Sequence, residues 1–214
     1  MLAVHNLALS VGGRTLIRSL SLEVAPGETV TLMGPSGAGK SSLLSFIGGD
    51  LGSAFTTAGI ATLNGTLLNG LAPERRQVAR LFQDDLLFPH MTVAENLLFA
   101  IPKMPQPERL GRMRAALAAA GLDGFEERPP HTLSGGQRAR VALMRALLSE
   151  PRAILLDEPF GRLDQELRQS IRDYTFGQIA ERRIPALLVS HDRSDVPPGG
   201  RIFIISNDGN VSHA

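Results

Sequence analysis

The sequence predicts an α/β protein in which a mostly parallel sheet is covered by helices on both faces and a helical subdomain is inserted. Three observations lead to this prediction. Short apolar runs such as Ala153–Asp157 alternate with amphipathic segments, which is typical of buried parallel strands joined by helices. Residues 92–148 carry only helical patterns, broken by Pro and Gly. The N-terminal stretch alternates apolar and polar residues, which indicates an antiparallel β region.

In the first half of the chain, apolar runs and turn signals place the elements. Pro26-Gly27 predicts a turn between two strands, and a helix is expected to begin near Lys40, after a glycine-rich loop. The strands expected in this half are Thr15–Val24, Thr29–Gly34, Gly59–Leu63 and Val78–Phe82.

In the second half, β/α alternation returns after the helical stretch. The segment Pro107–Leu122 begins with Pro and an early Glu and reaches Gly121, which together predict a helix. Asn207-Asp208-Gly209 predicts a closing hairpin. The remaining expected elements are a strand at Ala153–Asp157, a helix at Leu163–Arg183 and a strand at Ala186–Ser190. We therefore expect one domain over 1–214, with a core of residues 1–83 and 151–214 and a helical insertion of residues 84–150.

Composition excludes several classes of protein. The 22 basic residues balance 21 acidic ones, so a strongly nucleic-acid-binding domain is not indicated. The sequence has no cysteine, which rules out disulfides and thiolate metal sites and fits the cytosol. No apolar run approaches the ~18–20 residues that span a bilayer, and the N-terminus lacks a signal-peptide pattern. A membrane association would then run through another protein.

The stretch GPSGAGKS, residues 34–41, predicts a phosphate-binding loop. It matches G-x-x-x-x-G-K-[ST] and lies between an expected strand and an expected helix, which favours a nucleotide site over an ordinary glycine-rich turn. Lys40 is placed to reach the β- and γ-phosphates, and the Ser41 hydroxyl to bind Mg²⁺. The predicted nucleotide-binding residues of this loop are Gly34, Pro35, Ser36, Gly37, Ala38, Gly39, Lys40, Ser41 and Ser42.

Two carboxylates follow the apolar run Ala153–Leu156. Alone, such a pair is most often a helix cap or a solvated turn. Downstream of a phosphate-binding loop, Asp157 is instead expected to hold the Mg²⁺ shell, and Glu158 to polarise an attacking water. The pair predicts hydrolysis as well as binding of the nucleotide.

A second glycine-rich motif, LSGGQ at Leu133–Gln137, stands upstream of LLDEP. With the phosphate-binding loop, Gln83 in RLFQDDLLF and His191 in LVSHD, it completes five motifs in order. On these motifs the chain resembles, over nearly its full length, the ATP-binding subunits of ABC transporters, and it looks most like the YnjD-type importer ATPases of bacteria. The resemblance implies the P-loop NTPase core of an ABC ATPase, with ATP as substrate and Mg²⁺ as its metal.

The resemblance also implies roles for further residues. Gln83 would contact Mg²⁺ or the attacking water, and His191 would hydrogen-bond the γ-phosphate beside the catalytic Glu158. An isolated Gln or His is otherwise more often a surface or structural residue. The residues expected to act in trans, on ATP held by a second copy of the chain, are Ser134, Gly135, Gly136, Gln137 and Asp164. Glycines that allow close approach and a helix beginning near Gln137 suit phosphate, so an ATP-dependent homodimer is expected.

Two positions depart from the family pattern. Val11 stands where many relatives place an aromatic residue that stacks on adenine, so Val11 is expected to contact the base with little selectivity. Gly161 stands where a Ser is common, in the segment before Asp164.

Two other features keep two interpretations each. Arg138, Arg140 and Arg145 read most simply as a solvated helix face, with docking or nucleic-acid binding as the alternative. The segment Asp84–Ala100 is unusually apolar. It is either core packing of the helical subdomain or a groove that receives a membrane permease.

Together these features predict the ATPase of a bacterial import system, peripheral on the cytoplasmic face of the inner membrane. The expected partners are a second copy, membrane permease subunits and a substrate-binding protein, with no nucleic acid. The alternatives are a soluble ATPase acting on DNA or ribosomes, an exporter or cell-envelope regulator, and a nucleotide-gated module without turnover. The cargo is not written in this chain, because it binds other subunits.

Overall fold

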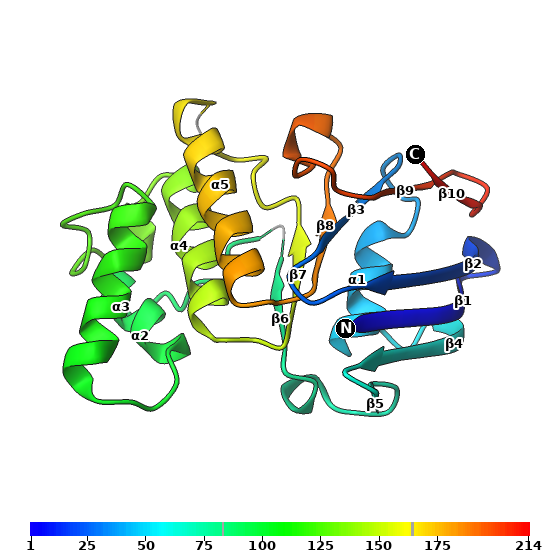
Figure 1. Cartoon of the computed structure of the whole chain (residues 1–214), viewed down its shortest axis with the longest axis horizontal. Helices are drawn as coiled ribbons and strands as arrows, with labels where there is room; N and C mark the ends of the chain where they lie inside the picture. Colours follow the sequence, from blue (N-terminus) through cyan, green and yellow to red (C-terminus); the bar gives the residue numbers. More distant parts are fainter. Residues whose placement is uncertain (83, 164) are drawn as a thin grey trace. The chain divides into compact units, whose positions relative to one another are not determined.

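The computed structural model describes residues 1–82, 84–163 and 165–214, which form two compact units. The first comprises residues 1–80, 152–158 and 179–214, and the second residues 81–151 and 159–178. The second unit thus includes residues 159–178, which lie outside the 84–150 insertion expected from the sequence. Figure 1 shows the helices and strands of each unit.

The first unit contains a four-stranded antiparallel sheet in the order β2-β1-β4-β5. Its N-terminal strands are joined through Gly12 and Gly13, whose φ values of 55° and 78° suit a tight hairpin turn. This sheet confirms the predicted antiparallel β region, although the first strand had not been located from the sequence. Its strands are β1 (Leu2–Val11), β2 (Arg14–Val24), β4 (Phe55–Leu63) and β5 (Thr66–Leu67).

The same unit contributes to a six-stranded, mostly parallel sheet in the order β10-β9-β3-β8-β7-β6. Every residue of β3, β7 and β8 is buried, as expected for parallel strands covered on both faces. The bounds are β3 (Thr29–Met33), β6 (Val78–Leu81), β7 (Ala153–Asp157), β8 (Ala186–Val189), β9 (Ile202–Ile205) and β10 (Val211–His213). Strands β9 and β10 form the predicted closing hairpin. The mixed, mostly parallel architecture agrees with the predicted fold class.

Helix α1 (Lys40–Gly48) belongs to this first unit. Its buried side chains Leu43, Leu44 and Ile47 join the core cluster that contains Leu155 of β7 and Leu187 of β8. Short 3₁₀ helices lie at Pro73–Arg75 (η1) and Arg193–Asp195 (η3). The packing of α1 on the sheet fixes the loop that precedes it, residues 34–39, at the carboxyl end of β3.

The second unit is helical. Helices α2 (Val93–Ala100) and α3 (Gln106–Ala119) both pack against α4 (Gly135–Leu148), and the 3₁₀ helix η2 (Pro130–Thr132) precedes α4. Helix α3 stops before Gly121, whose φ of 62° is left-handed. Helix α5 (Gln165–Glu181) provides most of residues 159–178. No strand occurs in residues 92–148, all of which the structure describes, as the sequence predicted.

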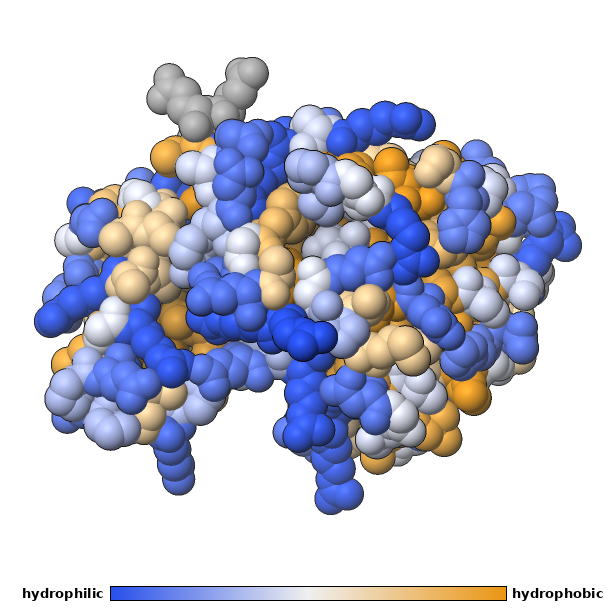
Figure 2. Space-filling view, viewed as in Figure 1, coloured by the Kyte–Doolittle hydropathy of each residue, from blue (hydrophilic) through white to orange (hydrophobic). Residues whose placement is uncertain are grey.

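The surface mixes polar and apolar side chains. Figure 2 shows apolar colour between hydrophilic side chains on the side where Figure 1 draws β1, β2 and β4. Within the described part of the chain, no helix is long and apolar enough to cross a membrane.

Candidate functional site

The loop of residues 34–39 has a backbone that requires its glycines. Gly34 has φ 146°, and a Cβ there would lie 2.2 Å from the carbonyl oxygen of Ile205. Gly39, the N-cap of α1, has φ 95°, a left-handed value that strains any L side chain. The loop therefore passes close to β9 and turns sharply into α1. Its N–H groups and the positive end of α1 are available to phosphate.

Lys40 lies in the first turn of α1 and turns back onto this loop. Its ammonium donates hydrogen bonds to the carbonyl oxygens of Gly34 at 2.8 Å and Pro35 at 2.7 Å. Burial lowers the pKa of Lys40, while the carboxylates of Glu158 and Asp157 act in the opposite direction. The buried ammonium thus faces neutral carbonyl oxygens. A phosphate oxygen carries more negative charge than these acceptors and would form a stronger hydrogen bond with Lys40.

Two of the three predicted Mg²⁺ ligands, Ser41 and Asp157, are brought together. The Ser41 hydroxyl donates a hydrogen bond to Asp157 Oδ1 at 3.2 Å. Hydroxyl and carboxylate oxygens are the hard donors that Mg²⁺ prefers, so this pair fits the ion. Among the described residues, no group of three or more metal-binding side chains occurs. An ion held here would share its coordination with phosphate and water, as Mg²⁺ commonly does.

Arg80, on β6, is a residue of this site that the sequence interpretation missed. Its guanidinium lies 3.7 Å from Asp157 Oδ2 and donates to the carbonyl oxygen of Ser41 at 3.3 Å. It also contacts the Ser45 hydroxyl and the Asp50 carboxylate, both at 2.7 Å. Its only sequence signal is a charge inside a short, half-buried strand, and such a charge needs a partner.

Burial, opposed by nearby donors and cations, sets the ionisation of Asp157. Burial raises the pKa of Asp157, and the neighbouring charge of Glu158 adds to this. The hydrogen bond from Ser41 and the charges of Arg80 and Lys40 lower the pKa, yet burial prevails. Asp157 is held in a place where its charge is costly, which is typical of functional carboxylates.

Glu158 and His191 lie next to each other. Glu158 follows the last residue of β7, and its N–H donates to the carbonyl oxygen of Val189 on β8 at 3.0 Å. Its φ of 49° is left-handed, a rare conformation for a glutamate. His191 Nδ1 lies 3.4 Å from Glu158 Oε1. The two predicted catalytic side chains of the described residues therefore face each other across the ends of neighbouring strands.

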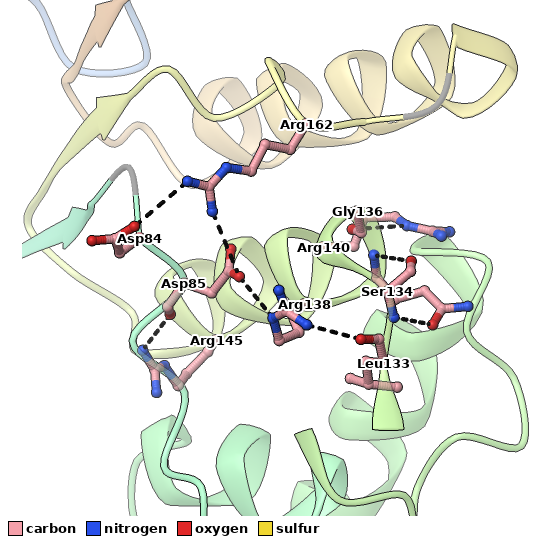
Figure 3. A network of polar contacts seen from close by, with 10 residues as sticks. Asp84, Asp85, Leu133, Ser134, Gly136, Arg138, Arg140, Arg145 and Arg162 are labelled. Carbon is pink, nitrogen blue, oxygen red and sulfur yellow. Dashed lines mark hydrogen bonds and ion pairs between the residues drawn. The ribbon is translucent and has the colours of Figure 1, made fainter. Parts of the chain in front are cut away.

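The second glycine-rich motif begins helix α4 within the helical unit, shown in Figure 3. The Ser134 hydroxyl accepts a hydrogen bond from the Gln137 N–H at 3.2 Å, and the Gln137 side chain accepts one from the Ser134 N–H at 2.9 Å. This reciprocal pair is a capping box. The helix begins at Gly135, two residues before the predicted start near Gln137, because the box already satisfies the first turn.

Of the three arginines expected to form a solvated face, Arg140 is buried, whereas Arg138 keeps 37% of its side chain exposed. Arg140 is 5% exposed and donates to the carbonyl oxygens of Ala120 at 2.8 Å and Gly136 at 3.4 Å. Burial lowers the pKa of Arg145, which donates to the carbonyl oxygen of Leu86 at 2.9 Å. For Arg140 the solvated interpretation was wrong, because guanidinium groups can be buried when carbonyl oxygens receive their N–H groups.

The remaining predicted residues are placed as follows. Val11 ends β1, pairs with Arg14 and packs partly against the core cluster. Gln83 and Asp164 lie outside the described residues. The phosphate-binding loop, Asp157, Glu158 and His191 belong to the first unit, whereas residues 133–137 belong to the second.

Comparison with known proteins agrees with this set of motifs. The ABC transporter family model matches residues 17–161. The chain is 45% identical to the uncharacterized ABC transporter ATP-binding protein YnjD of Escherichia coli (strain K12), over 95% of this chain and 94% of that protein. It is 36% identical to the sulfate/thiosulfate import ATP-binding protein CysA of Nocardia farcinica, over 99% of this chain and 63% of CysA. It is 39% identical to the spermidine/putrescine import ATP-binding protein PotA of Nitrosospira multiformis, over 99% of this chain and 58% of PotA.

Two solved structures of one protein share the fold. The dimeric structure of MJ0796, a bacterial ABC transporter cassette, has a TM-score of 0.84 and 28% identity, and covers 100% of this chain and 98% of that chain. The dimeric post-hydrolysis state of MJ0796 bound to ADP and Pi gives the same values. The architecture described above is that of these cassettes along the whole chain.

Proposed function

The chain belongs to the ABC transporter family as one of its ATPases, and from that premise we propose that it drives a separate membrane permease in a bacterial import system. The observation that carries the proposal is the assembly of Lys40, Ser41, Asp157, Glu158 and His191 in one unit. Relatives named as import ATP-binding proteins support the direction of transport. Because those relatives carry unlike cargoes at similar identity, no cargo is proposed.

We assign the chemical roles as follows. The ammonium of Lys40 leaves the loop carbonyls for the β- and γ-phosphates of ATP. Ser41, Gln83 and Asp157 would hold Mg²⁺, which neutralises charge on the phosphates when bound. Glu158 takes the proton of the attacking water, and His191 hydrogen-bonds the γ-phosphate, so that ADP and phosphate are the products. The left-handed backbone of Glu158 keeps its carboxylate beside His191.

Hydrolysis is proposed to require two copies of the chain. Ser134, Gly135, Gly136, Gln137 and Asp164 of one copy would complete the site on the phosphate-binding loop of the other. The capping box supports this assignment, because the Ser134 hydroxyl accepts from Gln137 and keeps its own hydrogen for a phosphate oxygen. The dimeric assembly of MJ0796 is a further support.

The segment Asp84–Ala100 is proposed as the surface that receives the permease. Leu86 and Phe99 are 57% and 65% exposed, and Leu86 has a left-handed φ of 43°. Phe88 packs edge-on against Phe99, with ring centroids 5.0 Å apart. The buried Asn96 accepts from the Phe88 N–H and donates to the Phe88 carbonyl oxygen. Hydrogen bonds from the buried Asn96 hold the backbone of this segment at Phe88, while the side chains of Leu86 and Phe99 are exposed to solvent, as a docking surface requires.

The double substitution Leu86→Asp with Phe99→Asp is expected to abolish co-purification with the permease while ATP binding persists. By contrast, Leu87→Asp with Phe88→Asp strikes half-buried side chains and is expected to lower the melting temperature as well. Loss of folding in the Leu86 and Phe99 variant would favour core packing as the role of these residues.

Turnover and location are tested together. Glu158→Gln is expected to bind ATP, to remain as an ATP-bound dimer and to hydrolyse ATP at least about 100-fold more slowly. In proteoliposomes that contain the permease, the ATPase activity of the parent chain is expected to rise. We expect the chain to bind the cytoplasmic face of the permease. We also expect a substrate-binding protein to belong to the same system. Stimulation by DNA or ribosomes alone would instead support the soluble alternative.

The selectivity of the site for ATP over GTP is expected to be weak. Val11 offers no ring for stacking, a contact worth ~1–3 kcal/mol per base where it has been measured on nucleic acids. We expect ATP and GTP to bind with affinities that differ by less than about tenfold, or roughly 1.4 kcal/mol. Competition titrations on the isolated chain measure the ratio. Val11→Tyr is the matched variant, and it should shift the ratio towards ATP.

A further inference from the structure

We propose that Asp85 is a positioning residue that holds the signature turn, residues 133–137, and that pairing of two ATP-bound chains depends on it. The inference rests on the proposed function, because it concerns the same composite site. It adds a residue two positions after Gln83, to which the RLFQDDLLF motif gives no role, and it connects this segment to the start of α4.

The contact runs from a carboxylate through a guanidinium to a carbonyl oxygen. The Asp85 side chain is only 11% exposed, and its Oδ2 lies 3.1 Å from Nε of Arg138. Another nitrogen of the same guanidinium donates to the Leu133 carbonyl oxygen at 2.8 Å. Leu133 directly precedes Ser134, so the contact ends at the turn itself (Figure 3). The carboxylate thus sets where Leu133 lies.

Electrostatics explain why Arg138 needs this carboxylate. Its N–H donates to the Ser134 carbonyl oxygen at 3.0 Å, so Arg138 stands in the first turn of α4. The N-terminal end of a helix is positive and disfavours a cation. The Asp85 carboxylate compensates the charge of Arg138 and fixes the plane of its guanidinium group. A lysine could not replace Arg138 here, because its single ammonium has no plane to fix.

Two other arginines tie the Asp85 segment to the rest of the helical unit. Arg162, in the segment after Glu158, reaches Asp85 Oδ2 at 3.9 Å and Asp84 Oδ1 at 3.5 Å. Arg145 donates to the Leu86 carbonyl oxygen at 2.9 Å and the Asp85 carbonyl oxygen at 3.5 Å. Asp85 is therefore the point at which three segments meet. A shift of residues 84–86 must move the signature turn or break the half-buried ion pair between Asp85 and Arg138.

The test uses the full chain in a Glu158→Gln background. The readouts are the dimer dissociation constant with ATP and Mg²⁺, from sedimentation, and nucleotide affinity at concentrations where the chain is monomeric. Asp85→Asn is expected to weaken the dimer by about tenfold or more, roughly 1.4 kcal/mol, without changing monomer affinity. Asp84→Asn is the matched control, because Asp84 is its neighbour and 82% exposed, and it should leave both values unchanged.

Three further variants sharpen the result. Asp85→Glu keeps the carboxylate and should retain most of the dimer affinity. Arg138→Lys should weaken the dimer, since one ammonium cannot serve both Asp85 and Leu133. The double variant Asp85→Asn with Arg138→Gln should lose no more than either single change, because both break one contact.

Full dimer affinity in Asp85→Asn, or additive losses in the double variant, would overturn the proposal. Equal loss of monomer nucleotide affinity would also overturn it, by making Asp85 a residue of general stability. A parent Glu158→Gln chain that fails to pair with ATP would overturn the composite site itself, a separate outcome read before any Asp85 variant.

Discussion

Helices α1 and α4 both begin at glycine-rich turns, but only α4 caps its own first turn with side chains. Gly39 precedes α1 in a left-handed conformation and provides no side-chain hydrogen bond. Ser134 and Gln137 precede and enter α4 and satisfy each other's N–H groups. The first N–H groups of a helix have no partner within the helix, so the two starts differ in what they leave for a ligand.

The difference separates a site that a ligand completes from one that is preformed. At α1, phosphate oxygens can take the uncapped N–H groups and the Lys40 ammonium, which presently faces carbonyl oxygens. At α4, the turn holds its shape unaided and offers a hydroxyl hydrogen and two glycines. A preformed second surface suits a part that must meet phosphate held by another molecule, because little ordering remains to be done on contact.

The largest effect expected at α1 is that of Lys40→Met. Turnover should fall at least about 100-fold, because the cation proposed to bind the γ-phosphate is gone. The melting temperature should not fall. The folded pKa of Lys40 lies below its usual value of 10.5, so the charged form costs stability at every pH below the folded pKa. Steady-state ATPase assays and calorimetry at pH 7 measure both, and a drop of several degrees would contradict this account.

At α4, Ser134→Asp should separate capping from phosphate binding. Aspartate is a good N-cap and suits the positive helix end, so the melting temperature should be unchanged or higher. If the proposed composite site forms, the added charge repels the γ-phosphate bound to the other copy, and ATP-driven pairing in a Glu158→Gln background should be lost. Sedimentation with and without ATP shows the outcome. Pairing equal to that of the parent would remove Ser134 from the composite site.

Ser134→Ala should also lose pairing, because the hydroxyl proposed to donate to the γ-phosphate is gone, and it should have a smaller, structural effect as well. Losing the cap costs about 1 kcal/mol, or roughly 2–4 °C for a chain of this size. Thr92→Ala is the matched control, because Thr92 and Glu95 form the same box at the start of α2. It should lower the melting temperature by a similar amount and leave pairing intact. Loss of pairing in both variants would point to helix stability alone.

The smallest effect concerns Asp157→Asn. The folded pKa of Asp157 is raised above 3.8 by burial, so its ionised form costs stability above the folded pKa and the cost disappears below 3.8. The variant should therefore melt slightly higher than the parent at pH 7, and the gap should close as the pH falls towards 4. A gap that is constant with pH would show that ionisation is not its cause.

The elements that the sequence predicted well are those with a local cause. Strand β7 is a continuous apolar run up to Leu156, β3 is a short buried strand that follows the Pro26-Gly27 turn, and glycines at fixed spacing set the loop after β3. The closeness of Ser41 to Asp157 follows, because Ser41 opens α1 after the loop at the carboxyl end of β3, and Asp157 is the last residue of β7 in the same sheet.

What the sequence did not predict depends on contacts between distant residues. Arg80 and Asp85 lie in the stretch RLFQDDLLF, but that motif points to Gln83 alone, and their importance appears only when their partners are placed. Arg140 looks solvated by charge alone, yet the carbonyl oxygen of Ala120, twenty residues away along the chain, receives its N–H group. The start of α4 was predicted two residues too late for a local reason. Gly135 and Gly136 have low helix propensity, but the capping box of Ser134 and Gln137 stabilises the helix start despite them.

At Glu158, the left-handed backbone should make selection for stability and selection for activity favour different residues. At φ 49°, a glycine would relieve strain and a glutamate preserves it. In a library randomised at this codon, sorting for heat resistance alone should enrich glycine, while sorting for ATPase activity should retain glutamate. Sequencing of the two pools would compare the frequencies of glycine and glutamate at position 158, and so show how strongly stability and turnover favour different residues there.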